Sequence, residues 1–367
     1  MVDPKVTVDG GEANSKKDAV GNGNRRRLRS ADIEEDAPST STNPVMDSRE
    51  RTESTKCNEG TETGGEAHLE GILPSRVFAM DCYPEPARLN IYSKASVIGS
   101  VADALAGTEA LETLLGSQFR QLFMLLVAGC PNSGKLIHSI LARQLITKKK
   151  YELWAVFGGK PIRFSIREFQ RVSGLKCSKI PQGHPLVPVV SKERSRKWKE
   201  LYGAHCKHMS VEGALKLLAD KDLDECKRLP IALIILIDGV LVTNKTLKLT
   251  PAYVDKLEDV QAFLDFPWGR LSFIRTLHCF GPEPMSTKTP NPIKKLKKRL
   301  TQQTSACYGF PLALQLLALE AIPLLLEKIP DSMKTATFLE EPSFCESGTI
   351  LLQAVKAEPF CYKLRTS

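Results

Sequence analysis

The sequence predicts an α+β fold that is mainly α-helical, with one small β-hairpin, preceded by a disordered N-terminal tail. Three observations lead to this prediction: a polar tail without aromatic residues, apolar residues at helical spacing through most of the remaining chain, and one stretch with a strand–turn–strand pattern. The chain has 367 residues, of which 42% are hydrophobic and 25% are charged. These values are ordinary for soluble globular proteins, so the local patterns must decide the fold.

The N-terminal tail differs sharply in composition from the rest of the chain. Residues 1–70 contain no Phe, Tyr or Trp and carry ten basic and fifteen acidic side chains. Such a segment cannot bury a core, so we expect it to be disordered. The total charge is +9, which leaves +14 on the remainder. We assign residues 71–200 to a first folded region, 201–329 to a helical extension and 330–367 to a weakly structured C-terminal segment.

The first folded region opens with helical spacing of apolar residues. The spacing covers Ser96–Leu115, and Gly107 is placed to divide it into two helices. The apolar run Leu122–Val127 fits either a buried strand or a buried helix, because periodicity does not distinguish the two. A further helix is predicted over Leu136–Thr147. The lysines that follow it, Lys148–Lys150, suit the negative end of a helix dipole.

The clearest local pattern is a hairpin followed by a capped helix. Tyr151–Phe157 is rich in strand-forming residues, and Gly158-Gly159 can supply the positive φ that a tight turn requires. Ile162–Phe164 is predicted as the returning strand. Ser165 and Glu168 have the spacing of a capping box, so a helix should begin there.

The rest of the chain is predicted to alternate helices with two proline-bearing loops, residues 175–195 and 281–299. Asp265 and Arg270 flank a Pro-Trp-Gly turn and are expected to pair. Apolar residues at helical spacing predict the helices Ser210–Leu218, Asp224–Leu241, Tyr253–Leu264, Leu271–Phe280 and Phe310–Ile329.

Several segments, in this order along the chain, resemble a plant family called domain of unknown function 1985. The resemblance implies transposon-linked ancestry and, in many relatives, a following cysteine protease domain that removes a ubiquitin-like modifier. We expect a close match over about residues 72–200 with an extension to about 325. The segments are Leu73–Arg76, Leu89–Tyr92, Tyr151–Trp154, Gly158–Ser165 with Glu168-Phe169, Phe266–Arg270 and Gly309–Gln315.

The protease activity of those relatives is not expected here. A cysteine protease needs a His base beside its Cys nucleophile, and residues 330–367 contain no His. Cys345 and Cys361 therefore lack the base that would activate a thiol. We predict no catalytic residue and no enzymatic activity, and interpret the chain as a stand-alone version, a truncated gene model or a splice product.

One motif points to phosphate binding. Residues 129–135 satisfy Gly-x4-Gly-Lys through Gly129, Gly134 and Lys135, after an apolar run and before a predicted helix. Asp238 ends a run of apolar residues, as a metal-orienting aspartate does. However, Leu136 stands where a phosphate-binding loop places the Ser or Thr that holds magnesium. The alternative is an ordinary turn and helix start with a solvated lysine.

Two basic clusters are candidates for nuclear import or nucleic-acid contact, since exposed cations bind phosphates and release counterions. Trp198 lies in a third basic stretch, where an aromatic ring can stack on bases or pack in its own domain. The predicted contact residues are Arg25, Arg26, Arg27, Arg29, Lys294, Lys295, Lys297, Lys298 and Arg299.

Other classes of function are excluded by what the sequence lacks. Residues 1–20 have no apolar stretch of a secretory signal, and the most apolar run, Leu229–Val242, falls short of the ~18–20 residues that span a bilayer. The ten cysteines form no Cys-x-x-Cys pair, so we predict no metal site and no cofactor, and thiols that remain free.

These observations favour a non-catalytic nuclear interaction module, or one associated with nucleic acid, of transposon ancestry. Two alternatives stay open: an accessory or remnant N-terminal region of the modifier protease, and an atypical nucleotide-binding protein. We expect a nuclear location, an unidentified protein partner, possible nucleic-acid binding and no membrane association.

Overall fold

The computed structural model describes residues 73–80, 82–85, 88–157, 160–184, 188, 193–329 and 331–344, and all statements below concern these residues. They belong to one compact unit of the chain. The predicted tail with Arg25, Arg26, Arg27 and Arg29 lies outside the described residues, as do Cys345 and Cys361.

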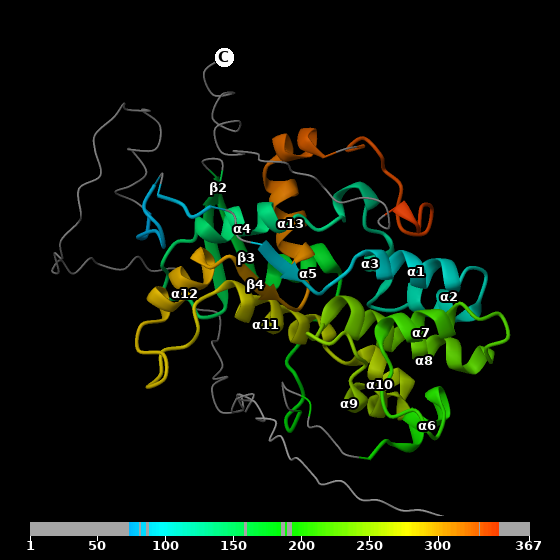
Figure 1. The fold of residues 1–367 in the computed structure, drawn as a ribbon. Helices are drawn as coiled ribbons and strands as arrows, with labels where there is room; N and C mark the ends of the chain where they lie inside the picture. The colour runs from blue at the N-terminus through cyan, green and yellow to red at the C-terminus, as the bar shows by residue number, and fades with distance from the viewer. Residues whose placement is uncertain are drawn as a thin grey trace, which may run out of the picture. The chain divides into compact units, whose positions relative to one another are not determined.

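The described residues form thirteen α-helices and four short strands (Figure 1), so the mainly helical α+β prediction is confirmed. The helices of the N-terminal half are α1 (Ser96–Ala104), α2 (Glu109–Leu115), α3 (Arg120–Phe123), α4 (Gly134–Ala142), α5 (Ile166–Ser173) and α6 (Arg196–Tyr202). Those that follow are α7 (Val211–Leu218), α8 (Glu225–Leu236), α9 (Pro251–Val254), α10 (Val260–Asp265), α11 (Trp268–Phe280), α12 (Pro292–Thr301) and α13 (Leu312–Ala321).

Helix α8 is the centre of one helical group. It continues into the π-helical turn Ile237–Leu241, and every residue of 230–243 is buried. Helices α1, α2 and α7 pack against α8. The predicted helix over Asp224–Leu241 is therefore confirmed in extent, although its last turn is π-helical. None of the described helices is long and apolar enough to cross a membrane.

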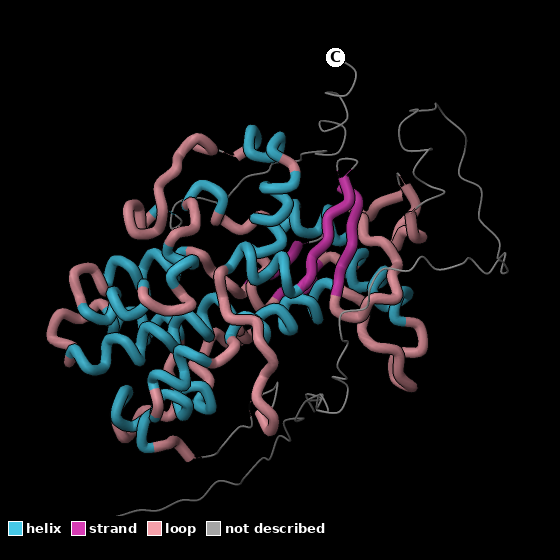
Figure 2. Tube along the Cα trace, turned by 180° about the vertical axis from the view of Figure 1, so that it is seen from behind, coloured by secondary structure: helices cyan, strands magenta, loops and turns pink. Residues whose placement is uncertain are grey.

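Two small sheets, seen as magenta strands in Figure 2, accompany the helices. Strands β2 (Glu152–Phe157) and β3 (Lys160–Ser165) pair antiparallel, with Glu152 opposite Ser165, as the hairpin prediction requires. Strands β1 (Arg88–Ile91) and β4 (Thr304–Cys307) pair in parallel, with Ile91 opposite Cys307. The sequence predicted only the hairpin, so this second sheet corrects the expected strand content.

Helix α5 connects the hairpin to the core. The Ser165 and Glu168 side chains form the predicted capping box, and Gly174 ends the helix with a φ of 70°. Because the cap fixes where α5 begins, Phe169 enters an aromatic cluster with Phe164 from β3 and Phe273 from α11, at ring distances of 5.6–6.2 Å. This cluster holds the hairpin against α11 and α13.

Two predicted boundaries are wrong for identifiable reasons. Helix α4 ends at Ala142 instead of Thr147, because the chain leaves the helix to pair with β2: Leu145 N–H donates to Trp154 O over 2.8 Å. Lys148–Lys150 thus follow a strand-like segment and have no helix dipole to compensate. The expected loop 281–299 becomes helical from Pro292, where the Asn291 side chain caps the first turn.

Candidate nucleic-acid interface

Helix α12 carries the second basic cluster on a framework that fixes which way each side chain points. Pro292 stands in the first turn, and Asn291 accepts a hydrogen bond of 2.9 Å from the amide of Lys294. Leu296 and Leu300, four residues apart, are both buried. One face of the helix is therefore bound to the domain, and the opposite face is left to solvent.

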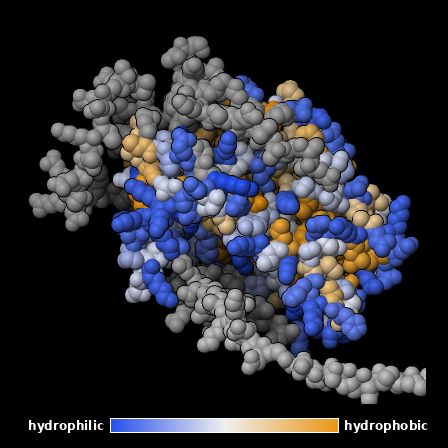
Figure 3. All heavy atoms as spheres, viewed as in Figure 1, coloured by the Kyte–Doolittle hydropathy of each residue, from blue (hydrophilic) through white to orange (hydrophobic). Residues whose placement is uncertain are grey.

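Three lysines form the solvent side of this helix, which we call the α12 lysine face: Lys294, Lys297 and Lys298. All three are exposed, and the structure gives none of them a salt bridge within the described part of the chain. The Nζ atom of Lys297 lies 5.8 Å above the ring of Phe78. In Figure 3, hydrophilic side chains gather over α12 on the left of the view.

The other two cations of the cluster differ from the α12 lysine face. The Nζ atom of Lys295 pairs with Glu283 over 2.6 Å. Arg299 turns inward, and its Nη2 donates to the carbonyl of Gly281 over 2.8 Å. Both were predicted as nucleic-acid contacts, but their charges are engaged within the domain, because α12 is helical and cannot present all five cations on one side.

Lys148–Lys150 form a second group of exposed cations. The segment Ser75–Phe78 contacts both the chain just before these lysines and Lys297 of α12. Ile146 N–H donates to the carbonyl of Ser75 over 2.7 Å, two residues before Lys148–Lys150. Three residues after Ser75, Phe78 lies beneath Lys297. At about 3.3 Å per fully extended residue, at most roughly 10 Å of backbone joins the two contacts.

Trp198 does not contribute to this surface. The side chain is fully buried, and its Nε1 donates to the carbonyl of Cys206 over 2.6 Å. Arg194 lies above the ring, 5.1 Å from its centroid. Of the two alternatives given for Trp198, the structure therefore agrees with packing in its own domain, where the ring is part of the core that anchors α6.

The residues of the phosphate-loop motif occupy a different setting from the predicted one. The preceding apolar run forms α3 and the 3-10 turn Val127–Gly129, so no strand leads into the loop. The fully buried Gln315 fills the loop: its Oε1 accepts from Ser133 N–H over 2.7 Å, and its Nε2 donates to the carbonyls of Gly129 and Pro131. One backbone N–H that could cradle a phosphate, that of Ser133, is thereby already engaged with protein.

The remaining motif residues do not converge on one another. Lys135 is exposed at the start of α4, and Gly134 packs near Leu89 of β1. Asp238 lies fully buried in the π-helical turn, and its two oxygens accept from the amide and hydroxyl of Thr250, each over 2.7 Å. The cofactor-binding alternative built on Gly129, Gly134, Lys135 and Asp238 is therefore corrected: Gly129 and Asp238 are engaged by Gln315 and Thr250 within the fold, and Lys135 is exposed at the start of α4.

Burial makes the Asp238 carboxyl an unusually weak acid. Removal from water raises the pKa of its carboxyl to about 7, although the hydrogen bonds from Thr250 and the charge of Arg275 act in the opposite direction. The carboxyl also faces the buried hydroxyl of Tyr202, whose own pKa is raised by burial and by Asp238. A neutral carboxyl is thus the form that the fold favours below neutral pH.

The raised pKa of Asp238 predicts that the stability of the folded protein depends on pH. The unfolded chain ionises Asp238 near the ordinary pKa of about 4, whereas the folded chain keeps the proton up to about pH 7. The contribution of the neutral carboxyl to stability is complete below pH 4 and is lost as the pH rises through 7. Urea unfolding should show that wild type loses stability between about pH 4 and 7 relative to Asp238→Asn, which cannot ionise.

The matched control for this experiment is Asp222→Asn, which alters an exposed aspartate outside the π-helical turn. Its stability should follow the wild-type pH profile. If Asp238→Asn also followed the wild-type profile, the carboxyl would have to be ionised in the folded protein throughout this range.

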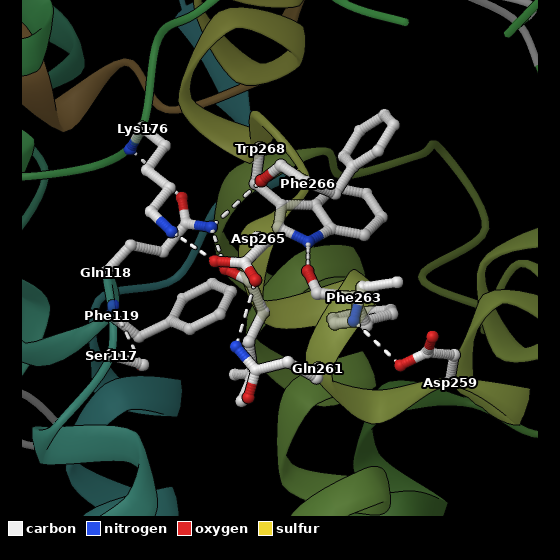
Figure 4. Close-up of polar contacts among 12 residues, drawn as sticks. Ser117, Gln118, Phe119, Lys176, Asp259, Gln261, Phe263, Asp265, Phe266 and Trp268 are labelled. Carbon is white, nitrogen blue, oxygen red and sulfur yellow. Dashed lines mark hydrogen bonds and ion pairs between the residues drawn. The ribbon is translucent and has the colours of Figure 1, made fainter.

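A polar network holds the Phe266–Arg270 turn in place (Figure 4). Buried Gln118 reaches across from the end of α2, and its Nε2 donates to the carbonyls of Leu264 and Phe266 over 2.6 and 2.9 Å. Its Oε1 accepts from the amide of Lys176 over 3.0 Å. Trp268 donates from Nε1 to the carbonyl of Phe263 over 2.8 Å. One glutamine therefore connects three parts of the chain.

The charged residues beside this turn have other partners than predicted. Asp265 forms an ion pair with Lys176, and Gln261 also donates to it. Arg270 donates from Nε to the carbonyls of Cys177 and Ser178. The expected Asp265–Arg270 pair does not form, because both side chains secure the 176–178 segment.

No three His, Cys, Asp or Glu side chains among the described residues are grouped so as to hold a metal ion. The search for known relatives adds one match. A family model described as domain of unknown function (DUF1985) matches residues 141–278. The chain carries a DUF1985 domain. No curated protein and no solved structure matches it.

The DUF1985 match covers β2, β3 and helices α5 to α11 almost completely, including the hairpin, the capping box and the Phe266–Arg270 turn. It begins later and ends earlier than the expected close match from residue 72 with its extension to 325. Helix α12, which carries the lysine face, begins at Pro292 and so lies outside the matched residues.

Sequence reasoning missed the residues whose roles depend on distant partners. Gln118 and Gln315 act on residues more than 140 positions away, apart from the nearer contact of Gln118 with Lys176. Cys279 and Cys307, which lie side by side, were considered only as scattered cysteines. Gln315 belongs to one of the segments that carried the family resemblance, which was the sole available signal.

Proposed function

We propose that this DUF1985-containing chain is a non-catalytic, nucleic-acid-associated module that acts in the nucleus, and that the α12 lysine face with Lys148–Lys150 contacts the phosphate backbone. The proposal agrees with the net charge of +14 outside the tail and with the transposon ancestry that the family resemblance implies. It depends most on one observation, the arrangement of charge along α12.

Two features of the charge on α12 oppose the stability of the helix, although Lys298 and Arg299 in the last turn suit its negative end. The positive end of a helix dipole favours acidic residues, yet the first turn of α12 has none and contains Lys294. Lys294 and Lys298 are one turn apart, a like-charge spacing that costs about 0.2–0.5 kcal/mol. Local rules of this kind are typically broken at functional positions, and a phosphate between the lysines relieves the repulsion.

The spacing also suits a nucleic-acid strand. Side chains three or four residues apart on a helix are about 6 Å apart, so neighbouring lysines can reach different phosphates of one strand. Contacts of this kind carry little sequence information, because they are made to the backbone and not to base edges. We therefore expect binding that is weakly sequence-dependent and strongly salt-dependent.

The test is Lys294→Gln/Lys297→Gln/Lys298→Gln in the full chain, assayed with a labelled 20-base-pair DNA duplex and a single-stranded RNA by fluorescence anisotropy. Each lost phosphate contact lowers the slope of log K against log salt by about 0.9 for duplex DNA. We expect the slope to fall by roughly 2 to 3 and binding at low salt to weaken accordingly.

The matched control is Lys221→Gln/Lys245→Gln/Lys248→Gln, which removes the same charge from exposed lysines elsewhere in the domain. This variant should keep most of the wild-type slope, because its lysines lie outside the proposed surface. If both variants lost the same amount of slope, binding would depend on the net charge of the protein and not on the α12 lysine face. Undetectable wild-type binding at low salt would end the proposal.

A further inference from the structure

Cys279 and Cys307 form a thiol pair between two elements that meet beside α12. Cys279 is the penultimate residue of α11, and Cys307 is the last residue of β4. The backbone N–H of Tyr308 donates to the Sγ of Cys279 over 3.3 Å, and Cys307 directly precedes Tyr308, so the two thiols are neighbours. A donor that points at a sulfur stabilises its thiolate.

The surrounding charges act on the same sulfur. The guanidinium groups of Arg299 and Arg275 face it from α12 and α11. Together with the neighbouring Cys307 and the Tyr308 amide they lower the pKa of Cys279 to about 7, against the effect of burial, whereas the pKa of Cys307 is raised well above its ordinary value. Cys279 is therefore the thiol that ionises first, and Cys307 keeps its proton.

The other titratable groups nearby do not reverse this assignment. The negative charge of Glu283 acts on Arg299 and His278, and burial keeps the pKa of His278 low. The phenol of Tyr308, stacked on Tyr92 at 5.2 Å, has a raised pKa and stays neutral. The cations are the only charged groups that the structure sets against Cys279 among the described residues.

The remaining described cysteines differ in their surroundings. Burial raises the pKa of Cys177 to about 12, and the Sγ of Cys130 donates to the carbonyl of Leu126 over 3.2 Å. Cys279 is partly exposed, whereas Cys307 is buried. Of the two residues, Cys279 is therefore the one that a reagent from solvent can approach, and Cys307 is the neighbouring thiol that can react with the product.

We propose that Cys279 and Cys307 are a reversible redox site, in which Cys279 reacts with a hydroperoxide and Cys307 completes a disulfide. The Cys279 sulfur attacks the outer oxygen of the hydroperoxide, the O–O bond breaks, and an alcohol or water leaves after taking a proton. Cys279 is then a sulfenic acid. The Cys307 sulfur displaces its hydroxyl, which leaves as water with the Cys307 proton.

Atoms and electrons balance over the whole reaction. Two thiols are oxidised to one disulfide, and the hydroperoxide is reduced by the same two electrons. Two molecules of a small thiol such as glutathione return the pair to its reduced form. The disulfide closes a loop from residue 279 to residue 307 that contains all of α12, and it removes the thiolate that faces Arg299.

The test exposes the full chain to graded hydrogen peroxide, blocks free thiols with N-ethylmaleimide and digests the protein without reduction. Mass spectrometry should find the 279–307 linked peptide, and it should disappear after dithiothreitol. In Cys307→Ser, peroxide should leave Cys279 as a sulfenic acid that a dimedone probe traps. In the matched control Cys226→Ser, which alters an exposed cysteine of α8, the linked peptide should form as in wild type.

A second measurement separates activation from mere proximity. Iodoacetamide labelling of Cys279 should rise with a midpoint near pH 7, and Arg299→Gln should move that midpoint upward, whereas Arg299→Lys should restore it in part. At pH 7 the rate should exceed that of an ordinary thiol about threefold, since a larger thiolate fraction outweighs its lower nucleophilicity. Absence of the linked peptide, or a labelling midpoint at the ordinary pKa of about 8.5, overturns the proposal.

Discussion

Replacing Gly309 by alanine is expected to destabilise the domain by about 4 kcal/mol or more, an effect that places the variant among the most damaging single substitutions. Gly309 has a φ of 81°, where a side chain costs about 1–2 kcal/mol. A Cβ here would also lie 2.6 Å from the backbone nitrogen of Thr276 and press against its hydroxyl. Thr276 is fixed within α11, so neither side can give way.

Chemical denaturation of Gly309→Ala and of the control Gly107→Ala distinguishes these two costs. Gly107 has a φ of 76°, and nothing lies within 4 Å of its hypothetical Cβ. The control should lose only the conformational cost of about 1–2 kcal/mol. Similar unfolding midpoints for the two variants would contradict the close approach of residue 309 to α11.

Replacing Gln315 by leucine is expected to cost about 3–5 kcal/mol, although the two side chains are similar in size. The change leaves the amide of Ser133 and the carbonyls of Gly129 and Pro131 without their partner. Each buried polar group deprived of its hydrogen bond costs about 1–3 kcal/mol. Because α13 holds the 129–133 loop through these contacts, the loop should also become sensitive to proteolysis.

The control is Gln303→Leu, at an exposed position just before β4. It should change the free energy of unfolding by no more than about 0.5 kcal/mol. A loss in Gln315→Leu as small as in this control would mean that water or a rearranged loop replaces the glutamine. Hydrogen exchange of the Ser133 amide then shows which of these occurs.

Local features of the fold could be predicted from the sequence because their causes lie within a few residues. The capping box needs only Ser165 and Glu168, and the end of α5 needs only Gly174. The hairpin follows from strand-forming residues on both sides of a glycine turn. The division of the first helical stretch follows from Gly107, which separates α1 from α2.

Features that depend on distant partners could not be predicted. Residues 88–91 have no strand signal of their own until residues 304–307 supply the second strand. The run Leu122–Val127 divides between the end of α3, a turn, a bridge from Leu126 to Thr337 and the start of a 3-10 turn, which periodicity alone does not reveal. Gln118 appears in the sequence as an ordinary polar residue, and only the fold shows that it is buried across the Phe266–Arg270 turn.

The candidate site was predictable in part for the same reason. The sequence locates the basic cluster, and helical geometry then separates Lys294, Lys297 and Lys298 from the inward Arg299. The phosphate-loop motif shows the opposite case. Its spacing is correct, but spacing does not reveal that Gln315 occupies the loop or that Asp238 faces Thr250.

The parallel pairing of β1 with β4 has a consequence for biosynthesis. Residues 304–307 must leave the ribosome before Arg88–Ile91 can pair with them. The sheet β1–β4 therefore forms only after most of the chain has been synthesised. During that interval the nascent chain presents unpaired strand edges and apolar helices to chaperones. The stretch 141–278 that the family model matches would likewise emerge before β4 and α13, so it must wait for elements outside it before its packing is complete.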